Sequence, residues 1–495
     1  MTYFYIYERK NHSTIFNHKI IFNHKMNQIL NQKEGSKSYL LGIVLVAVIG
    51  GLLFGYDTAV ISGAEQALES FFRSATDFDY TKGLHGITAS AALIGCVIGG
   101  GISGILSKRF GRKNSLIIAS VLFFLSALGS FDPEFLLFPH GVATHNVWIA
   151  FVFYRILGGI GVGLASAVCP MYIAEVAPAE KRGTFVSCNQ FAIIFGMLVV
   201  YFVNYIIKEN LSSDADMVSF GWRRMFLSEA FPAGIFGLLL LMVPKTPRYL
   251  AMNNDDEKAL YVLTRINGTE KAKSILASIK KTTTIKSQKL FTFGFTVVFV
   301  GMALSFLQQA IGINVVLYYA PRIFESMGAS GDTAMIQTVV MGLINIAFTL
   351  VAIFTVDKLG RKPLLIIGAT GMMIGMIALS ILSFSNQIGV AALIFIIIYT
   401  ASFMMSWGPI CWVLISEIFP NTIRSQAVAI AVAVQWVANF VVSSTFPSLS
   451  NWNIGATYLI YAFFCLIAIV FVHKMVPETK GKTLEDMNEV WKKKK

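Results

Sequence analysis

About twelve runs of roughly twenty apolar residues lie between Tyr39 and Val472. A helix needs about twenty such residues to cross the hydrocarbon core of a bilayer. The runs are solidly apolar and do not alternate with polar residues, which argues against a membrane β-barrel. The sequence therefore predicts an all-α membrane protein with twelve transmembrane helices. The expected spans are residues 39–63, 84–107, 115–130, 147–174, 184–207, 225–243, 291–320, 333–356, 363–383, 388–416, 425–447 and 455–472.

The composition supports this class and excludes others. Hydrophobic residues make up 55% of the 495 residues and charged residues only 14%, against roughly 25% charged in a soluble domain. The net charge of +13 comes from basic residues in short loops, so no nucleic-acid partner is expected. No span shows a nucleophile–base pair, a metal-ligand cluster or a phosphate-binding glycine loop. We therefore expect no enzyme, no metal and no cofactor.

Lys and Arg in the loops predict the orientation, because they concentrate on the cytoplasmic side of membrane proteins. The loops near 131–146, 384–387 and 448–454 contain neither residue, whereas the loops between them are basic. Both termini are therefore expected in the cytoplasm. The predicted organisation is a disordered leader at 1–38, starting at Met1 or Met26, an N-terminal six-helix half at 39–243, a cytoplasmic linker with short helices at 244–290, a C-terminal six-helix half at 291–475 and a cytoplasmic tail at 476–495.

An internal repeat supports the division into two halves. Phe-Gly-Arg-Lys ending at Lys113 returns as Leu-Gly-Arg-Lys ending at Lys362, an offset of 362 − 113 = 249. Glu175, Pro178 and Arg182 return as Glu417, Pro420 and Arg424, an offset of 417 − 175 = 242. Two repeated six-helix halves are typical of a carrier that exposes a central site to each side of the membrane in turn.

A series of motifs in order carries a family resemblance. They are GGLLFGYDTAVISG (50–63), PMYIAEVAP (170–178), NQFAIIFG (189–196), QQAIGINVVLYYAP (308–321), DKLGRKPL (357–364), SWGPICWVLISEIFP (406–420) and VPETKGKTLE (476–485). From about Tyr39 to Leu484 the chain resembles the sugar porter family of the major facilitator superfamily. The resemblance implies a proton-coupled importer of a monosaccharide in a bacterial inner membrane, working by alternating access and functional as a monomer.

Three ionisable residues fall inside the expected spans: Asp57, Arg155 and Glu229. Placing such a residue in the bilayer centre costs at least about 2.5–3.5 kcal/mol, so each should have a function. A carboxylate in an apolar helix can gain and lose a proton as a cation approaches or withdraws, and Arg155 is the natural cation for Asp57. The alternative is a permanent structural ion pair. By resemblance, Asp57 and Arg155 couple transport to protons.

The spans also contain amides and tryptophans that could bind a sugar, which offers many hydroxyls and a flat apolar face. Amides in lipid spans can instead join helices. By resemblance, the substrate-binding residues are Gln190, Gln308, Gln309, Asn314, Trp412 and Gln435, and the cavity-lining residues are Phe54, Met197, Leu317, Asn345 and Trp436. Gln308 and Asn314 can face one ligand only if the helix bends at Gly312, and Gly408-Pro409 should break the tenth span just before Trp412.

The loop motifs predict a latch of Arg–Glu pairs at the cytoplasmic helix ends; alternatively they are only topological charges. The expected latch residues are Arg112, Glu175, Arg182, Glu229, Arg361, Glu417 and Arg424. Lys108 and Lys245 stand where the family has acidic residues, so the latch of the first half should be weaker or differently paired.

Two alternatives to a proton-coupled xylose importer remain open at this stage. Xylose-carrying members of the family have Gln where Met197 stands, so a hexose such as glucose or galactose is also plausible. An uncoupled facilitative uniporter would have no use for a titrating Asp57. A transporter-like sugar sensor is a more remote possibility, because only about twenty residues follow the last span.

Overall fold

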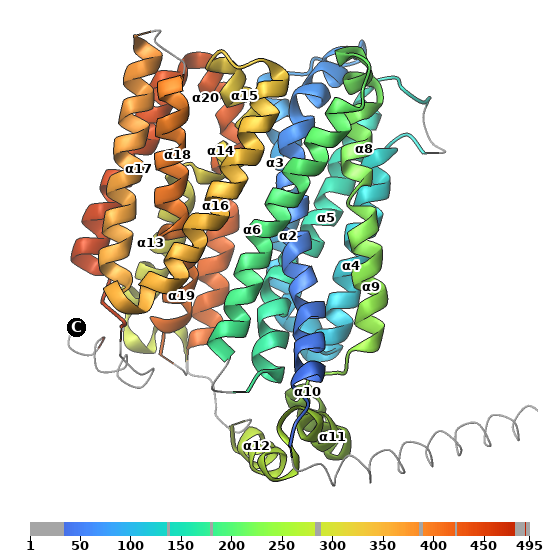
Figure 1. Ribbon diagram of the computed structural model, residues 1–495, viewed down its shortest axis with the longest axis vertical. Coiled ribbons are helices and arrows are strands. Elements are labelled where there is room, and N and C mark those ends of the chain that lie inside the picture. Colours follow the sequence, from blue (N-terminus) through green and yellow to red (C-terminus); the bar gives the residue numbers. More distant parts are fainter. Residues whose placement is uncertain are drawn as a thin grey trace, which may run out of the picture.

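The computed structural model describes residues 34–135, 139–178, 182–282, 289–385, 390–420, 423–480 and 491. Within this part of the chain the regular elements are helices, without a β-strand. Figure 1 shows two helical bundles side by side, the N-terminal half in blue to green and the C-terminal half in yellow to red. Of the predicted leader, residues 1–33 lie outside the described residues, and the first span, α2, begins at Lys37.

The N-terminal half contains six spans. The first five are α2 (Lys37–Arg73), α3 (Lys82–Arg109), α4 (Arg112–Phe131), α5 (His145–Val176) and α6 (Arg182–Glu209). The sixth consists of α7 (Asp214–Asp216), the π-helical turn η2 (Met217–Gly221), α8 (Trp222–Leu227) and α9 (Ala230–Met242).

The C-terminal half begins after a 3₁₀ turn, η3 (Leu290–Phe293). Its helices are α13 (Phe295–Ala310), α14 (Ile313–Tyr318), α15 (Ala320–Ser326), α16 (Gly331–Leu359), α17 (Arg361–Phe384), α18 (Val390–Met404), α19 (Trp407–Glu417) and α20 (Arg424–Met475). Eleven helices of the described chain are long and apolar enough to span a membrane. The last of them, α20, contains two spans, because the backbone of Asn453 is not helical (φ −166°, ψ 110°). The prediction of twelve spans in two halves is confirmed.

Two breaks in the C-terminal half lie beside the centre of the bundle. Gly312 adopts a left-handed conformation (φ 89°) between α13 and α14, which is the bend predicted there and is a conformation that glycine adopts at little cost. The break in the tenth span lies two residues earlier than predicted. It falls at Met405 and Ser406 (φ −138°, ψ −91° at Ser406), so that Pro409 occupies the first turn of α19, where its missing N–H leaves no hydrogen bond unmade.

Glycines bring α2 and α6 into close contact. A Cβ atom on Gly55 would lie 1.9 Å from the carbonyl oxygen of Ile193, and one on Gly196 would lie 2.1 Å from that of Leu52. Neither helix could carry a side chain at these positions without moving apart, as is common where membrane helices pack through small residues. This contact packs the α2 residues near Asp57 against the α6 face that carries Asn189 and Ile193.

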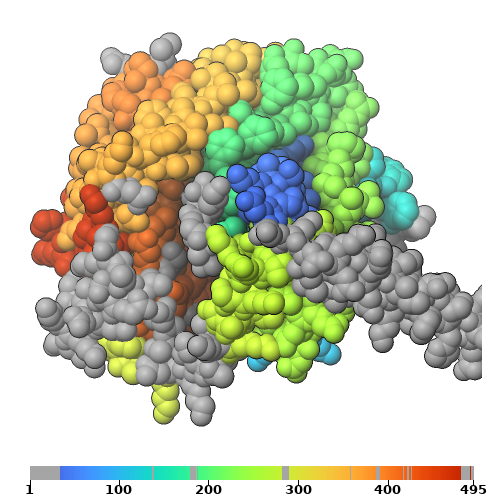
Figure 2. Space-filling model, turned by 60° about the horizontal axis from the view of Figure 1, so that its bottom comes forward, coloured from blue at the N-terminus to red at the C-terminus, as the bar shows by residue number. Residues whose placement is uncertain are grey.

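Three short linker helices mark one end of the bundle. They are α10 (Pro247–Met252), α11 (Asp256–Asn267) and α12 (Thr269–Thr282). The Ser36 amide donates to the Arg265 carbonyl at 2.8 Å, and the Arg265 guanidinium lies 3.6 Å from the centre of the Tyr39 ring. Figure 2 shows these yellow-green helices beside the blue start of α2. We call this the linker end and the opposite one the distal end.

The first span is longer than predicted at the distal end. The sequence predicts that it ends at Gly63, but α2 continues without interruption to Arg73. The additional segment contains two acidic residues, Glu65 and Glu69. Both are buried within α2, because they have charged partners on other helices, described below.

Candidate functional site

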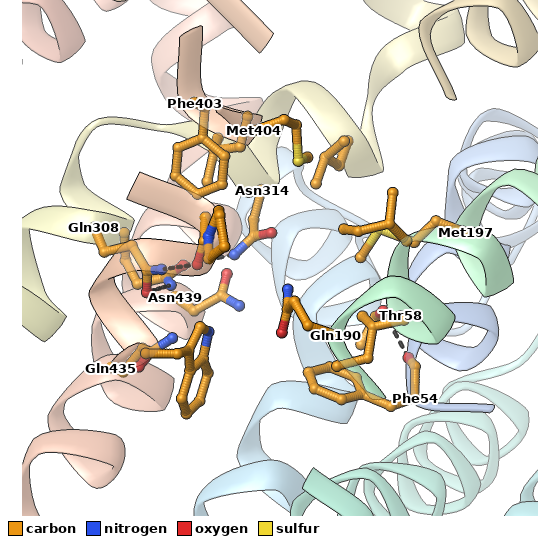
Figure 3. A pocket seen from close by; sticks show the side chains of 18 of the residues that line it. Phe54, Thr58, Gln190, Met197, Gln308, Asn314, Phe403, Met404, Gln435 and Asn439 are labelled. Carbon is orange, nitrogen blue, oxygen red and sulfur yellow. Dashed lines mark hydrogen bonds between the residues drawn. The ribbon is translucent and has the colours of Figure 1, made fainter. Parts of the chain in front are cut away.

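A cavity between the two halves collects the predicted polar side chains. All six predicted substrate-binding residues line it, together with Phe54, Met197, Leu317 and Trp436. The cavity encloses about 90 Å³ and opens partly to solvent. In Figure 3, Gln190 and Met197 of the N-terminal half face Gln308, Asn314 and Gln435 of the C-terminal half.

A chain of amides orders the C-terminal wall of the cavity. Gln308 Nε2 donates to the carbonyl oxygen of Trp407 at 2.9 Å and more weakly to that of Gly408 at 3.3 Å. Gln309 Nε2 donates to Gln308 Oε1 at 3.3 Å, and Asn314 Nδ2 donates to Gln309 Oε1 at 2.5 Å. The two helix breaks are therefore tied together by side chains that face the cavity.

Other polar atoms of this wall have no protein partner. Gln435 Oε1 and Trp436 Nε1 are buried without a hydrogen-bond partner in the described part of the chain. The Trp436 ring packs on Phe54 of the opposite half, with 5.7 Å between the ring centroids. Unpaired buried polar groups are costly unless a ligand satisfies them. Together with the aromatic rings, they suit a small polyhydroxylated molecule with one apolar face.

One predicted lining residue is misplaced, and others were missed. Asn345 is buried but does not line the cavity; Thr349, one turn later on α16, does. Asn439 lines the cavity, and its position one helical turn after Gln435 could have revealed it. The other lining residues that were missed are Thr58, Ile193, Ile194, Ile313, Tyr318, Phe403, Met404, Gly408 and Pro409. Most are apolar, and apolar residues in a span give no sign of which face they occupy.

A buried ion pair lies next to the cavity. Arg155 Nη1 lies 2.6 Å from Asp57 Oδ1, and Arg155 Nη2 donates to the Asp57 carbonyl oxygen at 3.1 Å. Asp57 is 0% exposed and Arg155 2%. Phe54 and Thr58, which line the cavity, lie on the same helix as Asp57, three residues before it and one after. A change at the ion pair can therefore reach the cavity through α2.

The structure contradicts the placement of Glu229 in the latch. Glu229 is completely buried before the start of α9, and the charged groups that act on its carboxyl are Asp57 and Arg155. It belongs to the buried cluster around the ion pair. This position agrees with the prediction that Glu229 lies inside a span, and only its assignment to the latch is wrong.

The latch pairs form within each half at the linker end. Arg112 Nη2 lies 2.7 Å from Glu175 Oε1 in the first half. In the second, Arg361 holds Glu417 through Nε and Nη2, at 3.3 and 3.1 Å. Arg424 donates to the Phe419 carbonyl at 3.2 Å. The side chain of Arg182, also predicted in the latch, lies outside the described residues.

The two halves differ in what surrounds the latch at this end. Glu478 accepts hydrogen bonds from the backbone amides of Arg361 and Lys362 at the start of α17, at 3.1 and 2.9 Å. Thr479 Oγ1 donates to Glu417 Oε2 at 2.6 Å. The corresponding position in the first half is Lys245, which cannot accept a hydrogen bond. The tail therefore reinforces the latch in the second half in a way that the first half cannot match.

The pKa of Glu478 is lowered from its ordinary value of 4.5. Partial burial alone would raise this pKa, but the backbone N–H groups of Lys480, Lys362, Arg361 and Thr479 outweigh it. Because the folded-state pKa lies below the unfolded value, the carboxylate stabilises the fold above the unfolded pKa. This stabilisation is lost as the pH falls through the folded pKa.

Glu478→Gln is therefore expected to lower the free energy of unfolding at neutral pH by roughly 0.3–1 kcal/mol, the usual contribution of a carboxylate at an exposed helix N-terminus. Thermal unfolding in detergent measures the change, with Glu209→Gln as the control, because Glu209 is an exposed carboxylate at the end of α6 and not at a helix N-terminus. The difference between Glu478→Gln and the parent should disappear at acid pH. Equal unfolding temperatures for both variants at neutral pH would contradict this prediction.

Two six-helix halves around a shared polar cavity are the architecture of alternating-access carriers. A family model described as "Sugar (and other) transporter" matches residues 43–491. The chain belongs to this family, which makes it a membrane transporter rather than an enzyme.

Individual relatives agree with the family model. The D-xylose-proton symporter of Escherichia coli strain K12 is 49% identical over 480 residues, covering 92% of this chain and 96% of that protein. The glucose facilitated diffusion protein of Zymomonas mobilis is 39% identical, covering 93% of this chain and 99% of that protein. The partially occluded inward open structure of the xylose transporter XylE from E. coli superposes with a TM-score of 0.83, at 47% identity, over 90% of this chain and 100% of that chain.

Proposed function

We propose that this protein imports a monosaccharide together with a proton by alternating access. The observation that carries the proposal is the shared cavity, where amides and tryptophans from both halves converge beside the buried Asp57–Arg155 pair. The sugar binds to the amides on both walls, with its apolar face on Trp412. Protonation of Asp57 loosens its hold on Arg155, so that α2 and α5 can shift while sugar is bound.

The same proposal includes the location of the protein. The linker end faces the cytoplasm, because the Lys and Arg residues of the loops concentrate there. Both termini, the linker 244–290 and the tail 476–495 then lie on the cytoplasmic side of a bacterial inner membrane. One chain contains both walls of the cavity, which supports a functional monomer.

The test is uptake of labelled monosaccharides into membrane vesicles, with and without an imposed pH gradient. Accumulation above the external concentration only with the gradient supports symport. Equilibration that ignores the gradient would identify a uniporter, and an absence of uptake for every sugar in the panel would contradict sugar transport.

A facilitative uniporter is the second candidate. It is supported by the short Asp57–Arg155 distance of 2.6 Å, which suits a permanent ion pair, and by the relative from Zymomonas mobilis, whose name describes facilitated diffusion of glucose. A permanent pair would leave the rate of sugar equilibration independent of pH. Counterflow measured from pH 5 to pH 8 therefore separates the two candidates.

Met197→Gln is expected to shift the preference toward xylose over glucose by about fivefold, because one added neutral hydrogen bond contributes about 1 kcal/mol. Met197 lines the cavity on the same α6 face as Gln190, two turns away. Competition of each sugar against labelled substrate measures the shift. Met197→Leu, which adds no amide, is the control, and an equal shift in both variants would show that volume rather than hydrogen bonding determines the preference.

A further inference from the structure

A second buried group of charged residues lies at the distal end, away from the cavity and from Asp57. We call it the distal cluster; its members are Glu65 and Glu69 on α2, Lys82 and His85 on α3, and Arg322 on α15. Glu65 is 0% exposed and His85 1%. Hydropathy assigned these positions no role, and neither sugar binding nor the Asp57–Arg155 pair uses them.

Arg322 makes the distal cluster a connection between the two halves. Its Nε atom lies 2.8 Å from Glu65 Oε1, and its Nη2 atom pairs with Glu69. The carboxylates belong to the N-terminal half and the guanidinium to the C-terminal half. Gln66 Nε2 donates to Glu325 at 2.7 Å, and Lys208 lies 3.1 Å from Asp332, both again across the halves. Opening the distal end must break these contacts and leave Glu65 without its cation.

The hydrogen bonds around His85 determine where its protons lie. Thr88 Oγ1 lies 2.8 Å from the Leu84 carbonyl oxygen, which can only accept, so the Thr88 hydroxyl donates there. The Tyr80 hydroxyl, 2.8 Å from Thr88 Oγ1, must then donate to Thr88. His85 Nδ1 lies 3.2 Å from the Tyr80 oxygen, which has no other proton to offer. His85 Nδ1 is therefore the atom that carries a proton and donates it to Tyr80.

This arrangement requires one more proton between His85 and Glu65. His85 Nε2 lies 2.8 Å from Glu65 Oε2. With Nδ1 already protonated, a neutral ring would turn the Nε2 lone pair toward a carboxylate oxygen, which is repulsive. The contact is attractive only when a proton lies between these two atoms, carried either by an imidazolium or by a carboxylic acid.

Other charged and titratable groups also lie around His85, on the helices packed against it. Glu69 Oε2 lies 3.7 Å from His85 Nε2, and the Tyr319 ring lies 6.5 Å from the imidazole. Lys82 and Arg73 pair with Glu69 at 2.5 and 2.9 Å. Glu65, Glu69 and His85 are close enough together to hold a metal ion. Arg322 and Lys82 already neutralise both carboxylates, however, so a proton fits this site better than a metal ion.

We propose that His85 and Glu65 form a second proton-binding site, and that the proton bound there weakens the attraction of Glu65 for Arg322 and so favours opening of the distal end. The proposal rests on the proposed function, in which the distal end faces outward. Protons on the outside then favour the conformation that is open to the outside.

The test measures opening of the distal end directly. Leu317→Cys places a reporter thiol in the cavity, and right-side-out vesicles are treated with a membrane-impermeant maleimide between pH 6 and pH 8. His85→Gln and Glu65→Gln remove the titration. The ratio of labelling rates, variant to parent, cancels the pH dependence of the reagent. We expect this ratio to change by about fivefold across the range, and Arg322→Gln to label faster than the parent at every pH.

The control is His140→Gln, which alters an exposed histidine at the same end, 3.5 Å from Asp132 in the same half; it should follow the parent at every pH. A constant ratio for both His85→Gln and Glu65→Gln would overturn the proton site, and parent-like labelling of Arg322→Gln would overturn its closing role. Arg322→Lys keeps the positive charge and should therefore label more slowly than Arg322→Gln. If the two variants label at equal rates, the faster labelling comes from a disturbed fold and not from the lost charge. Labelling needs no sugar, whereas sugar counterflow by the parent tests the proposed transport separately.

Discussion

Asp57→Asn is expected to abolish uphill accumulation of sugar while leaving exchange across the membrane measurable. Asparagine keeps the shape of the side chain and can still accept a hydrogen bond from Arg155, but it does not titrate. When no proton crosses the membrane together with the sugar, a pH gradient exerts no force on the sugar. The ratio of internal to external sugar should therefore fall to about one, whatever the gradient.

Two measurements in the same vesicles check this result. Accumulation driven by an acid exterior should disappear, and counterflow of labelled against unlabelled sugar should persist. Asp214→Asn on α7 is the matched control, because Asp214 is an exposed carboxylate in the same half, and it should accumulate sugar as the parent does. Undiminished accumulation by Asp57→Asn would refute the coupling role.

Gln308→Ala is expected to weaken sugar binding about fivefold or more. One lost neutral hydrogen bond corresponds to about 1 kcal/mol, which is about fivefold in affinity. The loss should exceed this value, because the substitution also removes the bonds from Gln308 to Trp407 and Gln309. The start of α19, which positions Trp412, and the amide chain to Asn314 would both be loosened.

Equilibrium binding of labelled sugar to the purified protein measures this effect. Gln337→Ala is the control, since Gln337 lies on α16 and is not among the residues lining the cavity. Thermal unfolding of both variants tests whether the protein remains intact. Parent-like affinity for Gln308→Ala would remove this residue from the sugar site.

The sequence predicts most of the fold, because lipid imposes a simple requirement on it. Every span needs about twenty apolar residues, and all twelve predicted spans overlap helices of the structure. Gly312 was correctly identified as a bend, because only a bend brings Gln308 and Asn314 to the same cavity. Depth and direction were harder to predict. Asn345 and Thr349 lie one turn apart on α16, and only packing decides which of them reaches the cavity.

The errors concern polar residues whose partners are distant in sequence. The predicted first span ended before Glu65 and Glu69, whose partner Arg322 lies more than 250 positions later in the chain. Glu229 was correctly predicted inside a span but was also assigned to the latch, because its neighbours Asp57 and Arg155 come from other helices. Hydropathy measures the cost of burying each charge and contains no information about the charge that offsets it.

The uninterrupted α2 helix connects three sites along its length. Within one helix of 37 residues, Tyr39 contacts the linker, Asp57 lies near the middle and Glu69 lies near the distal end. Asp57 and Glu69 are 12 positions apart in the sequence, a separation of about 18 Å at 1.5 Å per residue. A tilt of about 10° around Asp57 would displace Glu69 by about 3 Å, as much as the length of a hydrogen bond. A rearrangement of the Asp57–Arg155 pair that tilts α2 by this amount would therefore separate Glu69 from Arg322.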